Sequence, residues 1–296
     1  MNSVLPNPQG TADRIREAIG RQGWVRLALG AEAADHPLDA LEQWLLQVSN
    51  LLGLPVPQSS AGTLLAHIRN EGGDYSRHTT RGHQTNSDLS FHSDRCDWNL
   101  LFYVRPARNG GEVAVVSYGE AAAALATTNP TALDALFAPF PFDLREERIF
   151  AEPAWHCRPI LWRNAKGAVR GHYIRRFIFD SQRHSDCPRL GSRQTELLDQ
   201  FDATIRSLAA STRFLPCAGD LVVLDNYQVM HARSAFTDEA DSPRLALRTW
   251  VAPQTSDALP PSLHPLAGSC LGSVFRGGLG CDAEYHARLG QPIAQQ

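Results

Sequence analysis

The feature that most constrains the fold is a series of short β-rich segments without a regular alternation of strand and helix. A chain of this kind favours a β-sandwich or barrel over a parallel sheet covered by helices. We therefore predict a mainly β fold decorated by helices. The segments are LSFHSD, NLLFYVRP, GGEVAVVS, LVVLDN, VMHARSAF and RLALRTWV, all between residues 89 and 251.

Helices are predicted where apolar residues recur at helical spacing or where capping signals occur. A capping box formed by Ser117 and Glu120 starts one of them, and Pro130 opens the next. The other helices are predicted at residues 11–23, about 37–52 and 192–209. Further strands are predicted at residues 64–69, 142–148, 158–165 and 169–179.

Length and composition indicate a single domain that acts on a small molecule. The 296 residues, of which 43% are hydrophobic, suffice for one large core. We expect its central part at about residues 60–252, followed by an irregular tail rich in Pro and Gly at 254–296. The net charge is -3, and the 28 basic and 31 acidic residues are spread along the chain. This distribution argues against a nucleic acid or an anionic membrane as partner.

The sequence also indicates a cytoplasmic location. The first residues lack the pattern of a signal peptide, and no apolar run approaches the length of a membrane span. The six cysteines are scattered without CxxC pairs, which is typical of reduced thiols. Cys96 lies close to the candidate metal site in the sequence, and we expect it to pack in the core.

The tripeptide His92-Ser93-Asp94 is a candidate pair of metal ligands. Residues two apart on a strand project from the same face, so one ion can contact both side chains. His231 is the candidate third ligand, because it follows the buried-looking strand LVVLDN, which we expect to pair with the strand of His92. Two histidines and one carboxylate leave three positions open, as in non-haem Fe(II) oxygenases.

The tripeptide alone is weak evidence, because the chain contains it twice among its 11 histidines. The second copy, starting at His184, lies in a polar segment that contains a proline, and only one short strand remains before His231. We interpret that copy as a loop.

A second sequence pattern supports His92-Ser93-Asp94 as the metal-binding copy of the tripeptide. In the strand RLALR, Arg244, Ala246 and Arg248 share one face, so that two guanidinium groups point toward the same space. Such a pair can hold two anions, although two solvated arginines on an exposed strand are the commoner case.

Together, LSFHSD, the NGGE turn, GDLVVLDN, HARSAF and the RLALR strand resemble the TauD/TfdA-like (clavaminate synthase-like) Fe(II)/2-oxoglutarate-dependent dioxygenases. The resemblance runs from about residue 75 to 252. It implies a double-stranded β-helix (jelly-roll, cupin-like) core, iron on His92, Asp94 and His231, and 2-oxoglutarate and O2 as co-substrates.

By the same resemblance, Arg244 grips the distal carboxylate of 2-oxoglutarate, and Arg248 contacts an anionic group of the substrate. A planar guanidinium suits a carboxylate better than an ammonium group does. Many members carry Thr or Ser after GGE or GGD to donate to the same carboxylate, whereas this chain has Val113. Ser117 is the candidate replacement donor.

The implied reaction is oxidation of an unactivated C–H bond of a small carboxylate-bearing substrate, such as an amino acid or a specialised metabolite, with release of succinate and CO2. Hydroxylation is expected first, and desaturation or cyclisation are alternatives. A loop at residues 71–88 is expected to cover the pocket. Substrate contacts are predicted for Asn86, Trp98 and Tyr173. The competing hypothesis is a cupin-type metal-dependent hydrolase or isomerase that needs no 2-oxoglutarate.

Overall fold

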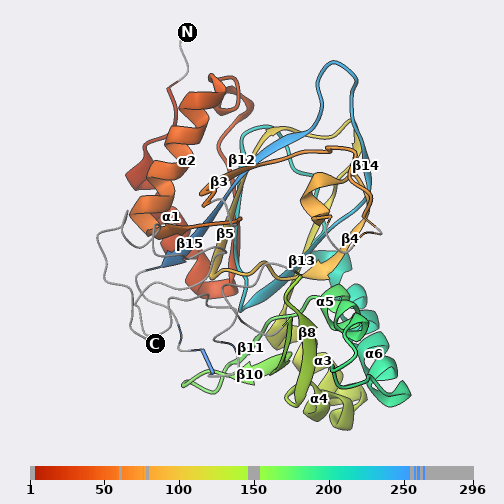
Figure 1. Ribbon diagram of the computed structural model, residues 1–296. Helices are drawn as coiled ribbons and strands as arrows, with labels where there is room; N and C mark the ends of the chain where they lie inside the picture. The colour runs from red at the N-terminus through yellow and green to blue at the C-terminus, as the bar shows by residue number, and fades with distance from the viewer. Residues whose placement is uncertain are drawn as a thin grey trace.

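The fold is built around a large antiparallel sheet with the strand order β1-β12-β5-β15-β2, to which β3 is added through β15 (Figure 1). The computed structural model describes residues 4–59, 62–75, 77, 80–145, 154–253, 257, 259, 260 and 263. The strands of this sheet are β1 (Trp24–Ala28), β2 (Gly53–Val56), β3 (Leu65–Ile68), β5 (Trp98–Arg105), β12 (Asp220–Asp225) and β15 (Leu245–Pro253).

A smaller antiparallel sheet, ordered β4-β13-β7, faces the large one. A cluster of apolar side chains fills the space between them, including Leu101 and Val222 from the large sheet and Val115 and Val229 from the small one. This arrangement is the predicted jelly-roll core. The small sheet consists of β4 (Leu89–His92), β7 (Val113–Ser117) and β13 (Val229–Arg233).

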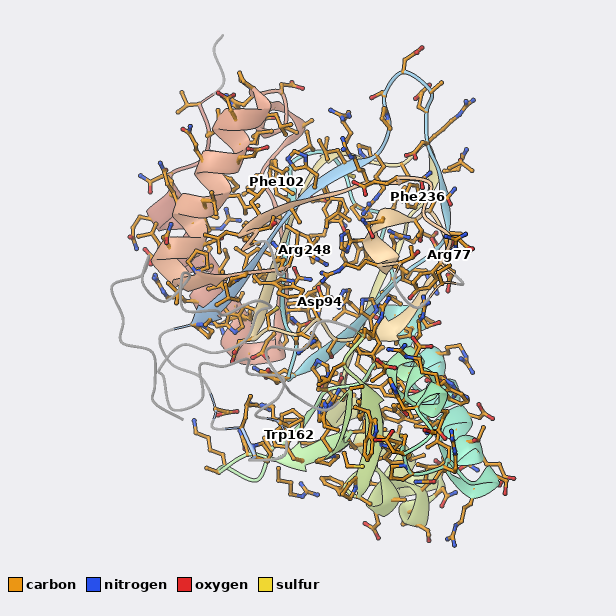
Figure 2. The ribbon with its side chains drawn as sticks, in the orientation of Figure 1. Arg77, Asp94, Phe102, Trp162, Phe236 and Arg248 are labelled. Atoms are coloured by element: carbon orange, nitrogen blue, oxygen red, sulfur yellow. The ribbon has the colours of Figure 1, made fainter. Side chains whose placement is uncertain are left out.

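Two helices, α1 (Pro8–Gln22) and α2 (Leu38–Leu52), cover the outer face of the large sheet. Alternation along β5 sends Phe102 outward against Trp44 of α2, at 5.4 Å between ring centroids. Figure 2 shows Phe102 on the helical side of the sheet, and Asp94 and Arg248 on its other side. Because both faces of the sheet are covered, strands β5 and β12 at its centre carry mostly apolar side chains on both faces.

A second helical layer packs beside the small sheet around its own apolar cluster. As predicted, Ser117 caps the first of these helices by accepting hydrogen bonds from the backbone N–H groups of Gly119 and Glu120, and Pro130 opens the second. The helices are α3 (Tyr118–Thr128), α4 (Pro130–Leu136), α5 (Arg175–Asp180) and α6 (Ser192–Leu208). Short strands complete the layer: β8 (Pro139–Asp143), β9 (Trp155–Pro159), β10 (Leu161–Arg163) and β11 (Val169–Gly171).

The structure corrects three predicted elements. The strand predicted to begin at residue 142 begins instead at Pro139 and ends at Asp143. The segment 169–179 is a strand only as far as Gly171, and from Arg175 it forms helix α5, which is tied to α6 by ion pairs of Arg175 with Asp199 and Asp202. At the predicted tight turn after Arg108, Asn109 and Gly110 instead form strand β6 (Asn109–Gly110), which pairs with β14 (Phe236–Thr237).

The predicted domain limits are only partly covered by described residues. Strands β1 and β2 belong to the large sheet although they precede residue 60, and most of the predicted tail at 254–296 lies outside the described residues. The four cysteines in the described part, Cys96, Cys157, Cys187 and Cys217, carry free thiols. Among the helices that the structure describes, none is both long and apolar enough to span a bilayer.

Candidate active site

The two candidate histidine ligands face each other on neighbouring strands of the small sheet. His231 of β13 lies directly opposite His92 of β4 in the antiparallel register, and their rings are 4.4 Å apart between centroids. The strand that pairs with β4 is therefore β13, whereas the predicted partner LVVLDN is β12 of the large sheet. A turn closed by the bond from the N–H of Gln228 to the carbonyl of Asp225 carries the chain between the two sheets.

Asp94 follows the end of β4 and is fixed by side chains from three other segments. Its N–H donates to Asn226 Oδ1 at 2.9 Å, and its Oδ2 accepts from Asn99 Nδ2 at 2.7 Å. Arg248 Nη1 lies 3.3 Å from the same Oδ2. Burial alone would raise the pKa of Asp94, but the Arg248 guanidinium lowers it to about 2, so the carboxylate is charged.

Ser93, between the two ligands, points the other way. Its Oγ lies 2.7 Å from the hydroxyl of Tyr118 in α3, and its N–H donates to the carbonyl of Tyr173 at 3.0 Å. The alternation expected for this tripeptide is therefore observed. It places His92 and Asp94 on the cavity side and anchors Ser93 in the core.

The three side chains fit a divalent iron ion. One possible ligand atom from each of His92, Asp94 and His231 lies within 4.8 Å of the others. His92 Nδ1 is 2.8 Å from the carbonyl of Ser90, which fixes the proton on Nδ1 and leaves Nε2 for a metal. Burial and the neighbouring His92 lower the pKa of His231 to about 3, so its imidazole is neutral, as a metal ligand must be.

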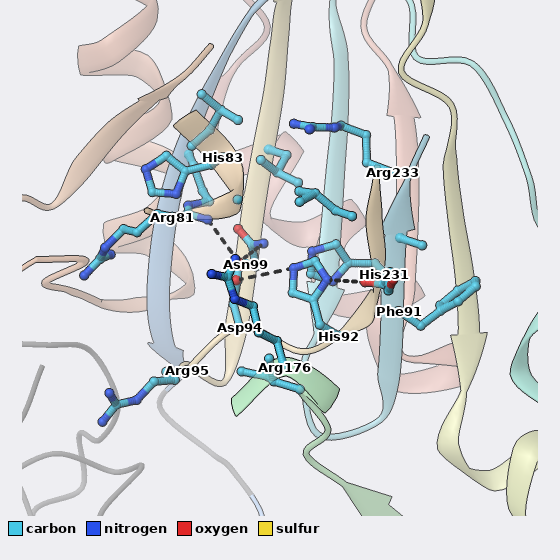
Figure 3. A pocket seen from close by; sticks show the side chains of 18 of the residues that line it. Arg81, His83, Phe91, His92, Asp94, Arg95, Asn99, Arg176, His231 and Arg233 are labelled. Atoms are coloured by element: carbon cyan, nitrogen blue, oxygen red, sulfur yellow. Dashed lines mark hydrogen bonds and ion pairs between the residues drawn. The ribbon is translucent and has the colours of Figure 1, made fainter. Parts of the chain in front are cut away.

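The triad opens into a cavity of about 420 Å³ whose charged lining is almost entirely cationic. Asp94 is the one acidic residue among the described residues that line it, and His83 also lines it (Figure 3). Burial and Arg248 lower the pKa of His83 to about 3. The lining contains eight arginines: Arg81, Arg95, Arg145, Arg175, Arg176, Arg233, Arg244 and Arg248.

Both arginines predicted from the RLALR strand line this cavity. Arg244 is buried, and its guanidinium lies over the rings of Tyr103 and Phe236, at 5.4 and 5.1 Å from their centroids. Arg248 contacts Asp94 and also donates from Nε to Gln58 Oε1 at 2.6 Å. The two guanidinium groups share one face of β15, as the spacing predicted.

Four other predicted site residues do not line the cavity. The side chain of Ser117 caps α3, as described above, and Asn86 is exposed. Trp98 packs against the core under α1 and α2. Tyr173 is buried in the second helical layer, where its hydroxyl donates to Asp202 Oδ1 at 2.8 Å.

The loop expected to cover the pocket does reach it, through Tyr75, Arg81, Gly82 and His83. Three residues of the site were not predicted from the sequence: Asn99 and Asn226, which hold Asp94, and the cavity-lining Arg233. Asn226 lies in the quoted motif GDLVVLDN, and Arg233 lies in HARSAF, so position within these motifs was the available signal.

The second copy of the tripeptide forms no comparable site. His184 Nε2 lies 3.0 Å from Asp143 Oδ2, and the metal-ligand cluster found among the described residues is the one at His92. Cys96 is buried, and its sulfur accepts a hydrogen bond from Asn226 Nδ2 at 3.1 Å. It packs beside the site, as expected.

Comparisons of the sequence with known proteins agree with this geometry. The sequence model of the family described as "Taurine catabolism dioxygenase TauD, TfdA family" matches residues 35–250. FR-33289 synthase of Streptomyces rubellomurinus (strain ATCC 31215) is 32% identical over 223 residues, which cover 72% of this chain and 64% of that protein. The match thus spans less than two thirds of the length of this relative.

Solved structures share the fold. An asparagine oxygenase in complex with Fe(II), 2S,3S-3-hydroxyasparagine and succinate has a TM-score of 0.62 at 17% identity, over 82% of this chain and 78% of that one. The non-heme iron oxygenase OrfP in complex with Fe and alpha-ketoglutaric acid has a TM-score of 0.59 at 19% identity, over 83% and 80%.

Proposed function

Because this chain belongs to the taurine catabolism dioxygenase TauD, TfdA family, we propose that it is an Fe(II)- and 2-oxoglutarate-dependent oxygenase of a small carboxylate-bearing molecule. The reaction is oxidation of an unactivated C–H bond. Hydroxylation is its simplest outcome, and desaturation or ring closure would begin at the same bond.

The observation that carries this proposal is the opening of the His92, Asp94 and His231 triad into the arginine-lined cavity. Two imidazoles and one carboxylate would leave about half of the coordination positions of an iron ion open to other ligands. A keto acid and a carboxylate substrate are both anionic, and a buried cationic lining offsets the cost of removing their charges from water.

With iron and 2-oxoglutarate bound, the centre supplies oxidation by O2: one oxygen atom enters the substrate, the other enters succinate, and CO2 leaves. The side chains of the triad hold the metal. Arg244 donates to the distal carboxylate of 2-oxoglutarate, for which its planar group is suited. Arg248 keeps Asp94 charged and presents positive charge to the substrate.

The rest of the cavity orients the substrate and limits water. Apolar residues such as Leu89, Phe91 and Ile174 line it together with the arginines. Amino acids are the first substrate class to test, because the two solved relatives named above include an asparagine oxygenase and an oxygenase that was also solved with (3S)-hydroxy-L-Arg. A carboxylate on the substrate would find its counter-charge in the cavity arginines.

The decisive experiment mixes the protein with Fe(II) and 2-oxoglutarate without oxygen and records the visible charge-transfer band of the chelate. We expect the band in the unaltered protein and its loss in His231→Ala, while His36→Ala, a histidine outside the cavity, retains it. Absence of the band from the unaltered protein would contradict the proposal and favour a metal-dependent hydrolase or isomerase. Succinate release measured over a panel of amino acids then identifies the substrate.

A further inference from the structure

We propose that Arg233 is the second donor to the distal carboxylate of 2-oxoglutarate, in the place where many members of the family use a hydroxyl after GGE or GGD. The inference rests on the proposed function and names the residue that compensates for Val113. It follows from the register of one strand pair, the burial of two arginines and the spacing along β13.

The register of the small sheet places Arg233 directly opposite Val113. The two residues are Cα partners in the antiparallel pair of β13 and β7, and directly opposed residues project from the same face. Both line the cavity. A long side chain at position 233 therefore reaches the space that a hydroxyl at position 113 would have served.

Arg233 and Arg244 are two buried cations of the cavity lining that lie against the same aromatic ring. They are 6% and 3% exposed, and their guanidinium groups lie 4.7 and 5.1 Å from the centroid of the same ring, Phe236. Neither side chain has a carboxylate partner among the described residues. Two like charges held against the same ring and away from water call for an anion between or beside them.

The hydrogen bonds of Arg233 leave donor capacity. Its Nη2 donates to the backbone carbonyls of Thr85 and Ser87, at 2.9 and 2.6 Å. Its Nε is buried and has no hydrogen-bond partner among the described residues. A buried donor without a partner costs free energy, which an acceptor from a bound ligand would recover.

The distance along β13 from His231 to Arg233 also fits the length of 2-oxoglutarate. Arg233 follows the iron ligand His231 by two residues on the same face, which is roughly 7 Å of extended chain. A five-carbon keto diacid that chelates the metal at one end spans a comparable length. Figure 3 shows Arg233 and His231 facing the same cavity from this strand.

The alternative is a structural role, in which Arg233 only ties down the loop at Thr85 and Ser87. The two roles differ in what they predict for 2-oxovalerate, which has the same chain length and keto acid group but lacks the distal carboxylate. Loss of a carboxylate donor weakens 2-oxoglutarate binding alone, whereas loss of the loop anchor changes the binding of both ligands.

The test titrates Fe(II)-loaded protein with each keto acid without oxygen and follows the charge-transfer band, with calorimetry as a second measure of binding. We expect Arg233→Gln to raise the dissociation constant of 2-oxoglutarate roughly ten- to hundredfold, the usual worth of a charge-assisted hydrogen bond, and to leave that of 2-oxovalerate unchanged. Arg105→Gln is the matched control, because Arg105 also donates to a backbone carbonyl but lies outside the cavity.

A compensating variant locates the carboxylate. Val113→Thr introduced into Arg233→Gln should regain part of the 2-oxoglutarate affinity without changing 2-oxovalerate binding. Equal effects of Arg233→Gln on both ligands, or no effect on either, would overturn the assignment of Arg233. If Val113→Thr restores no affinity for 2-oxoglutarate, the distal carboxylate does not lie beside residue 113. A missing band in the unaltered protein would instead contradict the proposed function itself.

Discussion

The guanidinium of Arg248 lies 3.3 Å from the carboxylate of Asp94, measured from Nη1 to Oδ2. Arg248 belongs to β15 of the large sheet, and Asp94 follows β4 of the small one. The ion pair therefore joins the two sheets at the metal site. It makes Arg248 a positioning residue for the proposed iron ligand Asp94, as well as a cation of the proposed substrate cavity.

Arg248→Gln is expected to weaken Fe(II) binding about tenfold, because groups that hold a metal ligand typically contribute ten- to hundredfold to affinity. The measurement is an anaerobic Fe(II) titration without 2-oxoglutarate. Arg244→Gln is the comparison: among the described residues the guanidinium of Arg244 contacts Ile68 and Tyr103 and not the triad, so this variant should leave the Fe(II) affinity unchanged. If Arg248→Gln binds Fe(II) as tightly as the unaltered protein does, Arg248 does not position the metal ligand and its role is limited to binding the substrate.

Tyr118→Phe removes the hydroxyl that lies 2.7 Å from Ser93 Oγ. We expect a loss of about 1–3 kcal/mol in the free energy of unfolding, the usual cost of leaving a buried polar group without its partner, together with weaker Fe(II) binding. Tyr173→Phe, which removes a buried hydroxyl bonded to Asp202, should lower stability alone. Denaturant unfolding and Fe(II) titration of both variants check this, and equal Fe(II) affinities would contradict the link from α3 to the triad.

The sequence predicted those parts of the site that depend on local periodicity. Alternation along a strand was enough to place His92 and Asp94 on one face and Arg244 and Arg248 on another, and the family resemblance joined the two sets. The structure confirms the β-rich fold, and the comparisons confirm the family.

The helix and the site residues that the sequence did not predict depend on contacts between segments that are distant in the sequence. The segment 169–179 has the β-branched and aromatic residues of a strand, yet ion pairs of Arg175 with α6 favour a helix there, because tertiary contacts override weak local propensity. Asn99 and Asn226 contact Asp94 because β5 and the turn after β12 meet beside β4, and alternation within a single strand does not predict that meeting.

Gly219→Ala and Gly167→Ala separate backbone strain from steric clash. Both glycines have φ of +79°, but a Cβ at Gly219 would lie 1.8 Å from the carbonyl oxygen of Gly30, whereas one at Gly167 meets nothing within 4 Å. Gly167→Ala should cost about 1 kcal/mol from the left-handed conformation alone, and Gly219→Ala more than about 3 kcal/mol. Denaturant unfolding measures both, and similar losses would contradict the close approach at Gly30.

The loss of folding stability in acid should depend on the carboxyl group of Asp143. Burial alone would raise the pKa of this carboxyl, but hydrogen bonds from Arg183 and from the backbone N–H of Arg145 hold the pKa below its usual value. The charged carboxylate is thus favoured by folding. The stability that it adds is complete above the ordinary carboxyl pKa of about 3.9 and is lost as the pH falls through the lowered folded value.

The melting temperature of Asp143→Asn should therefore lie below that of the unaltered protein at neutral pH, and the difference should shrink below about pH 4. Thermal melts between neutral and acidic pH provide the measurement, with Asp241→Asn as an exposed carboxylate control. A difference that persists unchanged into acid would show that Asp143 acts by packing and not by its charge.

Two kinds of segment line the cavity. Strands of the two sheets supply His92, His231, Arg233 and Arg244, whereas its outer part comes from connections, namely the loop with Tyr75 and His83 and the helix α5. Connections tolerate sequence change far better than paired strands do. A lineage with this architecture can therefore acquire new substrates by altering its connections, while the inherited oxidation chemistry stays under the stricter selection that acts on the sheets.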